Sequence, residues 1–431
     1  MFQIRKNWKW TVTWWLVLHA MAGTVRLRAE DRWVPIGPEG GKVMNVVSHP
    51  AQDGVLYLTA GDAPTSLYKS ADRGNTWDKV AFSYGKIFSL AINRTNPNDL
   101  YAGLYGQIYR STDGGSTWTS IAVNQTQFND LLPDPLNPNV IHAAGYIYDT
   151  GLSRNLMAYL KSTDKGVTWS SLTLANTEGY GLALCLDPKN SQVLFLGGYA
   201  VGNGTAAKLF KTTDGGASWS DATGPLPYMV HDLIMDSTDV RRVLALTEFG
   251  FYWSTDMGAG WQKNNGFVSG RCLAQDPKNK NTLYIGQKNQ VFASIDGGLN
   301  WTPYGNGLLD AKEIHCLLVD QNLPSTVYMG SDGGFFKSTD GGSQWMCCNT
   351  GIFSTHITAV HPIPSNPSVV YTAHQDGYVF RTQNAMAKKE SAWAVSWEKV
   401  TTIPDCDSYV IRTILTDPSD QNLVYLYKSA G

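Results

Sequence analysis

Short apolar segments alternate along the chain with clusters of turn residues, and residues 271–304 show this pattern in full. Three apolar stretches of strand length occupy 271–275, 282–286 and 291–294, and Trp301 opens a fourth. Apolar stretches of this length, bounded by Asp, Asn, Pro and Gly, predict β-strands joined by tight turns. We therefore expect a unit of four antiparallel strands.

The same unit recurs along most of the chain, and most copies carry the motif S/T-x-D-x-G-x-x-W between the third and fourth strands. Seven copies of the motif begin at Ser70, Ser111, Ser162, Thr212, Ser254, Ser294 and Ser338. Their aspartates are Asp72, Asp113, Asp164, Asp214, Asp256, Asp296 and Asp340. Successive motif tryptophans lie 40 to 51 residues apart. This period is typical of the four-stranded blades of a β-propeller.

Each residue of the motif has a physical reason to be there. The Asp carboxylate can accept hydrogen bonds from backbone N–H groups of a turn, and the Gly can adopt positive φ. The Trp buries roughly 150–250 Å² and can seal one unit against the next. A calcium site is the alternative, but calcium needs clustered oxygens and each motif supplies a single carboxylate. We expect the seven aspartates to be structural.

These motifs resemble the Asp-box of the BNR-repeat family, whose members are β-propellers. The family includes sialidases, xyloglucan-active hydrolases, sortilin-type receptors and photosystem assembly factors. The resemblance covers residues 33–431 and implies an all-β fold, a propeller of four-stranded blades. It also implies that the boxes lie in turns away from the active sites, so it says little about function.

The number of units predicts about nine blades. Seven boxed units are followed by an eighth, residues 356–400, that lacks the box. A ninth starts at Tyr409 and lacks its fourth strand. The segment Trp33–Gly37 matches a fourth strand and could close a single ring of nine, because closure removes exposed edges. A segment of a longer chain with several propellers is the alternative.

Composition and the N-terminus bear on location and partners. The chain has 431 residues, of which 43% are hydrophobic and 16% charged, and a net charge of -2. This balance argues against nucleic acid as a partner. Basic residues precede the apolar run Trp10–Ala22, which predicts a signal peptide over 1–22, a short leader over 23–32 and a secreted, periplasmic or cell-surface protein. An uncleaved membrane anchor is the alternative; no later segment predicts an integral membrane domain.

The six cysteines do not suggest a metal site, and we expect no metal and no cofactor, because neither a C-x-x-C pair nor a His cluster occurs. Cys185, Cys272 and Cys316 lie in apolar strands and are expected to be core residues. Cys406 with either Cys347 or Cys348 is the disulfide that we would test first.

Two long loops are predicted on the face opposite the boxes, which is where ligands usually bind such a fold. They span residues 145–158 and 197–207. Their candidate ligand-binding residues are Tyr146, Tyr148, Asp149, Arg154 and Tyr199. Aromatic, amide and carboxylate groups together suit sugar recognition. Variable surface loops without a ligand are the alternative.

A second candidate site comes from the position five residues before the first turn of each unit. In five successive units this position holds His231, Arg271, His315, His356 and Arg412. These side chains would form a polar, partly cationic arc at the channel mouth, able to attract an acidic ligand. Hydrogen bonding of each side chain between blades is the alternative.

Catalysis would need two opposed carboxylates. The start of the repeats, Trp33–Gly41, resembles the first domain of the xyloglucan-active group, but the T-D-x-G-G loop of that group is replaced here by residues 59–63. Asp62 and Asp332 are the speculative catalytic pair. We expect a module that binds or scaffolds a glycan or protein ligand, with a glycoside hydrolase as the alternative.

Overall fold

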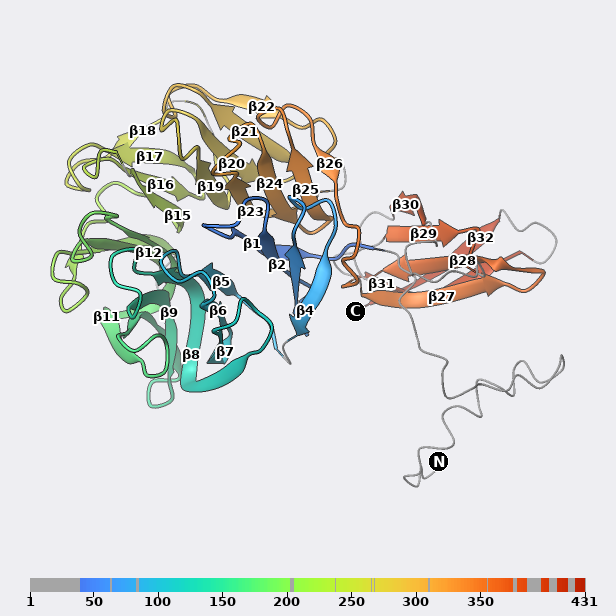
Figure 1. Cartoon of the computed structure of the whole chain (residues 1–431), viewed down its shortest axis with the longest axis horizontal. Coiled ribbons are helices and arrows are strands. Elements are labelled where there is room, and N and C mark those ends of the chain that lie inside the picture. Colours follow the sequence, from blue (N-terminus) through green and yellow to red (C-terminus); the bar gives the residue numbers. More distant parts are fainter. Residues whose placement is uncertain are drawn as a thin grey trace.

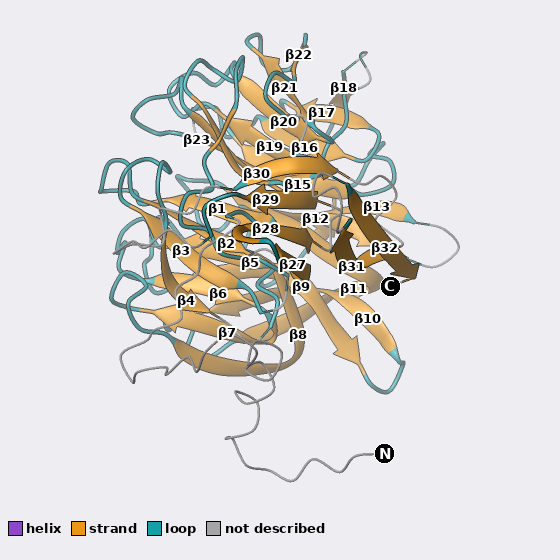
Figure 2. Ribbon diagram, turned by 90° about the vertical axis from the view of Figure 1, so that its right-hand side faces the viewer, coloured by secondary structure: helices purple, strands orange, loops and turns teal. Residues whose placement is uncertain are grey.

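The computed structural model describes residues 39–430 except 63, 83–84, 202–204, 237, 265, 267, 309–310, 355, 375–377, 386–396, 403–408 and 418–422. The predicted signal peptide and leader, the segment Trp33–Gly37 and Cys406 lie outside the described residues. Within them the ordered elements are β-strands without an α-helix, and so no helix there is suited to crossing a membrane (Figure 2). The all-β prediction is confirmed.

The strands form antiparallel sheets whose order follows the sequence. The first sheet contains β1 (Val43–Ser48), β2 (Leu56–Ala60), β3 (Ser66–Ser70) and β4 (Asp78–Phe82). The next sheet contains β5 (Ser89–Ile92), β6 (Leu100–Gly103), β7 (Tyr105–Ser111), β8 (Thr119–Pro133), β9 (Ile141–Asp149), β10 (Arg154–Ser162), β11 (Ser170–Leu186), β12 (Leu194–Ala200), β13 (Ala206–Thr212) and β14 (Ser220–Asp221). Three further sheets contain β15 (Val230–Met235), β16 (Val243–Thr247), β17 (Gly250–Ser254) and β18 (Gln262–Lys263); β19 (Cys272–Gln275), β20 (Leu283–Gln287), β21 (Gln290–Ser294) and β22 (Thr302–Tyr304); and β23 (Ile314–Val319), β24 (Val327–Ser331), β25 (Gly334–Ser338) and β26 (Met346–Cys347). The remaining strands are β27 (Ile357–Ile363), β28 (Asn366–His374), β29 (Tyr378–Thr382), β30 (Glu398–Thr402), β31 (Tyr409–Thr416) and β32 (Val424–Ala430).

The ten-stranded sheet is three blades in succession. The first half of β8 pairs with β7 and the second half with β9, so that β8 is the outer strand of one blade and the inner strand of the next. β11 joins β10 to β12 in the same way. Gln125 and Ala175 take positive φ, 60° and 49°, where each long strand passes from one blade to the next. Blades 1 to 7 therefore run from β1–β4 to β23–β26.

These seven blades close into a ring, because β1 of blade 1 lies against β23 and β24 of blade 7 (Figure 1). A buried cluster that includes Val43 and Tyr68 of blade 1 with Tyr328 and Phe335 of blade 7 fills this boundary. Gly40 also forms a parallel bridge with Phe353. We call the boundary between blades 7 and 1 the seam.

The last six strands lie to one side of the ring (Figure 1). β27–β30 form a four-stranded sheet, and β31 and β32 form a two-stranded sheet that packs on β27 and β28. The expected units are thus present, eight with four strands and one with two. They are arranged differently from the single ring of nine, since blade 1 meets blade 7 and leaves the last two units outside.

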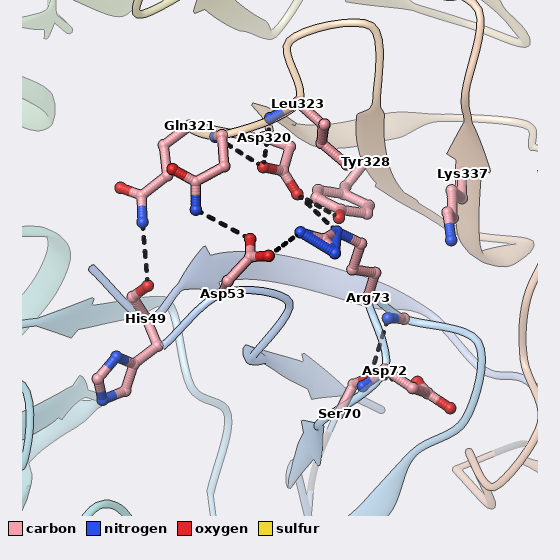
Figure 3. A network of polar contacts seen from close by, with 12 residues as sticks. His49, Asp53, Ser70, Asp72, Arg73, Asp320, Gln321, Leu323, Tyr328 and Lys337 are labelled. Carbon is pink, nitrogen blue, oxygen red and sulfur yellow. Dashed lines mark hydrogen bonds and ion pairs between the residues drawn. The ribbon is translucent and has the colours of Figure 1, made fainter. Parts of the chain in front are cut away.

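Polar contacts from the turns of blade 7 hold the seam (Figure 3). The guanidinium of Arg73, in the first box, contacts the carboxylate of Asp53 and lies 3.7 Å from that of Asp320. The Gln321 amide donates to the carbonyls of His49 and Pro50, at 3.2 and 3.0 Å. Arg73 has a φ of 59°, close to those of Lys165 and Met257 at the same position of their boxes (62° and 60°), so this conformation belongs to the box turn.

The box forms the turn that its residue types predict. In blade 7 the Ser338 hydroxyl donates to Asp340 Oδ1 at 2.8 Å and accepts from the N–H of Gly342 at 2.8 Å. Asp340 Oδ1 also accepts from the N–H of Gln344 at 2.9 Å, and this bond lowers the pKa of Asp340. Trp345 follows the turn and is buried. The carboxylate is thus occupied by bonds within its own turn.

Candidate functional site

The face opposite the boxes carries the connections from second to third strands and from each blade to the next. We call it the loop face. Residues 145–158, predicted as a loop, mostly form the ends of the long strands β9 and β10. These strands extend the loop face outward over blades 3 and 4, and we call this region the raised part. A Cβ at Gly145 would lie 1.8 Å from the Gln127 carbonyl oxygen, and one at Gly198 would lie 2.0 Å from that of Tyr180. Glycine at these positions lets the raised strands approach closely.

Six aromatic side chains lie along this part of the loop face, on elements of blades 2 to 5, as four successive rings and a separate pair. The rings of Tyr105 and Tyr146 are 6.3 Å apart, those of Tyr146 and Tyr180 are 5.0 Å apart, and those of Tyr180 and Tyr199 stack at 5.1 Å. Tyr180 and Tyr199 are also direct partners in the pairing of β11 with β12. Burial, and then the neighbouring Tyr180 and Tyr228, raise the pKa of the Tyr199 hydroxyl.

Tyr228 is near enough to Tyr199 to affect the pKa of its hydroxyl, and it pairs with Phe249, whose ring lies 5.2 Å away. Tyr228 has a φ of 65°, which is strained for a bulky side chain. Its side chain is nevertheless 37% exposed, and Phe249 is 45% exposed. We call the six residues Tyr105, Tyr146, Tyr180, Tyr199, Tyr228 and Phe249 the aromatic row.

Hydrogen bonds fix two of the inner rings. The Tyr146 hydroxyl donates to Gln127 Oε1 at 3.0 Å, and the Asn155 amide donates to the Tyr180 hydroxyl at 2.7 Å. Tyr146, Tyr180 and Tyr199 are half-buried, whereas Tyr105 at the other end is 50% exposed. The row is therefore a rigid platform whose ends are open to solvent.

The predicted residues of the two loops divide into two groups. Tyr146 and Tyr199 belong to the row. Asp149 caps the hairpin turn by accepting from the N–H groups of Gly151 and Leu152, and Arg154 lies 3.7 Å from Glu178. Tyr148 is half-buried on β9. Sequence reasoning missed Tyr105, Tyr180, Tyr228 and Phe249, which occupy a different position in each blade and so leave no periodic signal.

The other part of the loop face, over blades 6, 7 and 1, carries ion pairs. His315 Nε2 donates to Asp332 Oδ1 at 2.7 Å, and Lys42 Nζ lies 3.2 Å from the same oxygen. Burial opposes ionisation of Asp332, but the bond from His315 and the charge of Lys42 lower its pKa to about 2. Asp332 is therefore a carboxylate at every physiological pH.

Asp62 lies on the same face across the seam. The backbone carbonyl of Lys42 accepts from the N–H of Gly61 at 2.9 Å, while the ammonium of Lys42 reaches Asp332. The structure thus brings the loops of the two candidate carboxylates to either side of one residue. The Asp62 side chain is 62% exposed and lies 3.4 Å from Lys86 Nζ.

The predicted arc is recognisable as a backbone feature. In five of the ring's inner strands one residue is skipped in the pairing with the second strand, as in a β-bulge. These skipped residues are Met44, Asn129, Leu182, His231 and His315. The bulge re-aims the side chain at the start of the inner strand. Arg271 comes directly before β19.

The arc is not cationic, however. His231 bonds Glu248 at 2.6 Å, His315 bonds Asp332, and Arg271 lies 3.5 Å from Glu313. Each of these three arc residues therefore faces a carboxylate, and the expected attraction of the arc for an acidic ligand has no basis there. His356 and Arg412 belong to the two units outside the ring, so they cannot join the same mouth. In their sheets the skipped residues are Thr358 and Arg412.

Two carboxylates on the inner strands were not predicted. Asp130 accepts from the N–H of Leu184 in the next blade at 2.8 Å, and Asp232 accepts from that of Leu273 at 2.8 Å. Each carboxylate thus accepts a hydrogen bond from a backbone N–H of the inner strand of the next blade. Burial raises the pKa of Asp130 to about 6 and that of Asp232 to about 7. Their role is to join blades.

Comparisons with solved structures place the protein in a class. A GH74 enzyme from Niastella koreensis superposes with a TM-score of 0.66 at 18% identity, covering 91% of this chain and 70% of that one. The GH74 xyloglucanase from Xanthomonas campestris gives a TM-score of 0.62 at 14% identity, covering 88% and 72%. At such identities the likeness shows the fold alone, and that fold is a β-propeller.

Sequence comparisons are more particular but shorter. A xyloglucanase from Paenibacillus sp. is 29% identical over 186 residues, which cover 38% of this chain and 16% of that protein. A xyloglucanase from Acetivibrio thermocellus is 29% identical over 171 residues, covering 37% and 17%. The chain thus spans about a sixth of the length of these curated relatives. No family model matches the chain.

Proposed function

We propose that the protein is a glycoside hydrolase that acts on a polysaccharide held on the loop face. The observation that carries this proposal is the setting of Asp332, a carboxylate kept ionised by His315 and Lys42 on the ligand-accessible face. The partial sequence matches to xyloglucanases support it. The predicted signal peptide also suits a substrate outside the cell.

The chemistry assigns different tasks to the two groups. Glycoside hydrolysis uses one carboxylate as base or nucleophile and one carboxylic acid that protonates the leaving oxygen. With its pKa at about 2, Asp332 cannot donate a proton at neutral pH and suits the first task. It would either activate a water molecule or stabilise the positive charge that develops on the sugar ring. Asp62, across the seam, is the candidate for the second carboxyl group.

The experiment is a hydrolysis screen of the full chain over xyloglucan, hydroxyethylcellulose, mannan and polygalacturonate, with product sugars as the readout. Asp332→Asn should lower the rate by about a hundredfold or more, the usual loss when a general acid or base is removed. Asp221→Asn is a matched control, because Asp221 also pairs with a lysine, Lys208 at 3.1 Å, but lies away from the seam on β14. An Asp332→Asn protein that retains its rate would contradict the proposal.

A binding or scaffolding module is the second candidate. It is favoured by the fact that each candidate carboxylate already has a cation within 4 Å, Asp332 with Lys42 and Asp62 with Lys86. Retained binding of a polysaccharide without any product from the screen would select this function.

A further inference from the structure

We infer that the aromatic row is a binding track for a neutral, linear polysaccharide, separate from the carboxylates at the seam. The inference deepens the proposed function by assigning the surface that holds the chain, and it rests on that function for the class of ligand. The row takes its members from four consecutive blades, so it extends along the loop face and does not form a closed pocket.

The chemistry of the row defines the ligand. The axial C–H groups of a pyranose ring present an apolar face, and an aromatic ring offers a complementary flat surface that loses little conformational entropy on binding. The surrounding polar groups are neutral amides such as Gln127 and Asn155. The nearby charges are compensated, with Arg154 beside Glu178 and His231 beside Glu248. An acidic polymer would find no free positive charge among these contacts.

The conformation of Tyr228 is independent support. A bulky residue held at φ 65° is strained, and such strain persists where the surrounding structure imposes it, often at functional sites. Tyr228 is not held there by burial, since its side chain is 37% exposed. The strained backbone instead presents the ring beside Phe249, at the end of the row.

Because of this strain, one substitution at Tyr228 can separate a role in binding from a role in folding. Glycine adopts positive φ without strain, so Tyr228→Gly should leave the protein as stable as before or more stable. It removes an exposed ring of the row, however, and should weaken binding about tenfold, the usual loss for an aromatic anchor. A merely structural tyrosine would give the reverse result, with lower stability and unchanged binding.

The measurement is affinity electrophoresis and calorimetry of the full chain with hydroxyethylcellulose, in the Asp332→Asn background so that the polymer is not cleaved. Lys165→Gly is the matched control, because Lys165 has a φ of 62° but lies in a box on the opposite face. We expect weaker binding for Tyr228→Gly and Phe249→Ala, unchanged binding for Lys165→Gly, and no binding of polygalacturonate by any variant. Unchanged binding by both Tyr228→Gly and Phe249→Ala would overturn the inference.

The length of the track gives a second readout. Tyr105→Ala, at the far end, should weaken binding of a six-unit β-glucan oligosaccharide more than that of a two-unit one, because only the longer ligand can contact several members of the row. Equal losses for both ligands would overturn the idea of a continuous track.

The inference and the proposed function can fail separately. If Asp332→Asn loses hydrolysis and Tyr228→Gly binds as before, the proposed hydrolase function is supported and the binding track is contradicted. If Tyr228→Gly binds more weakly but the unmutated chain hydrolyses no polysaccharide, the binding track is supported and the hydrolase function is contradicted.

Discussion

Blades 5 and 7 each contain a histidine bonded to a carboxylate, but the two pairs have different surroundings. In each blade the skipped residue of the inner strand is a histidine that bonds a carboxylate of the turn between the second and third strands. The distances are 2.6 Å for His231 with Glu248 and 2.7 Å for His315 with Asp332. In blade 7 the carboxylate also meets Lys42 of blade 1 and is 20% exposed, whereas Glu248 is 44% exposed.

The residue that follows the carboxylate also differs between the two blades. Phe249 follows Glu248 and ends the aromatic row, whereas Gly333, which has no side chain, follows Asp332. A shared histidine–carboxylate pair is therefore not in itself a sign of catalysis. Blade 7 is distinguished by a third group, the ammonium of Lys42, which ring closure brings to the carboxylate of Asp332.

The largest expected difference between the blades is in hydrolysis. Glu248→Gln removes the same kind of carboxylate as Asp332→Asn, yet we expect it to change the rate on the screened polysaccharide by less than about threefold, against a loss of about a hundredfold for Asp332→Asn. Initial rates at saturating and at low substrate give kcat and kcat/KM. Equal losses in the two variants would show that the pair acts on the fold in both blades.

Stability should differ in the same direction. Asp332→Ala leaves Lys42 and the buried His315 without their partner and should lower the free energy of unfolding by roughly 2–3 kcal/mol. Glu248→Ala should cost less than about 1 kcal/mol, because the carboxylate of Glu248 is more exposed and solvent replaces its contacts. Urea unfolding followed by tryptophan fluorescence measures both values.

The pH dependence separates Asp332 from the inner-strand carboxylates. The folded pKa of Asp332, about 2, lies below the unfolded value of 3.8, so its contribution to stability is complete above about pH 5 and is lost as the pH falls toward 2. The pKa of Asp232 is raised to about 7, so folding favours its protonated form and stability falls as the pH rises from about 4 to 7.

Asp232→Asn should consequently stabilise the protein at pH 8 by roughly 1–2 kcal/mol and have little effect at pH 4. The Asn carbonyl can still accept the Leu273 N–H. Asp239→Asn serves as the control, since Arg241 lowers the pKa of Asp239 and its substitution should bring no gain at pH 8. A melting temperature of Asp232→Asn that stays below that of the unmutated protein at pH 8 would refute this prediction.

The smallest effect is expected in the boxes. Asp340→Ala removes one acceptor from an exposed turn and should lower stability by about 1 kcal/mol, with hydrolysis and binding unchanged. Loss of either activity at an unchanged melting temperature would contradict the structural role of the box. The same substitution at Asp256 in blade 5 should behave alike, because Gly260 N–H donates to Asp256 Oδ1 in the same way.

Several features of the molecule could be predicted from sequence because they depend on short, fixed spacings. The box turn needs only a Ser or Thr, an Asp and a Gly at set positions. The position five residues before the first turn marked the skipped residue in blades such as 3 and 5, since the turn and the bulge lie on one strand. This spacing rule predicted the wrong residue in the eighth unit. There the first turn lies between Ile363 and Asn366, and the skipped residue is Thr358, not His356.

What the sequence by itself determined was the repeating unit, its four strands, the box turn and the start of each inner strand, because these are set by residues close together in the chain. The ring of seven, the pairing of Asp332 with Lys42 and the aromatic row were decided by the tertiary structure. Every unit offers a similar side to its neighbour, so the number of blades that closes the ring depends on specific contacts across the seam, such as those of Arg73 with Asp320 and of Gln321 with the carbonyls of His49 and Pro50. The row takes its members from four blades, and side chains such as Tyr105 and Tyr146 become neighbours only once consecutive blades pack around the axis.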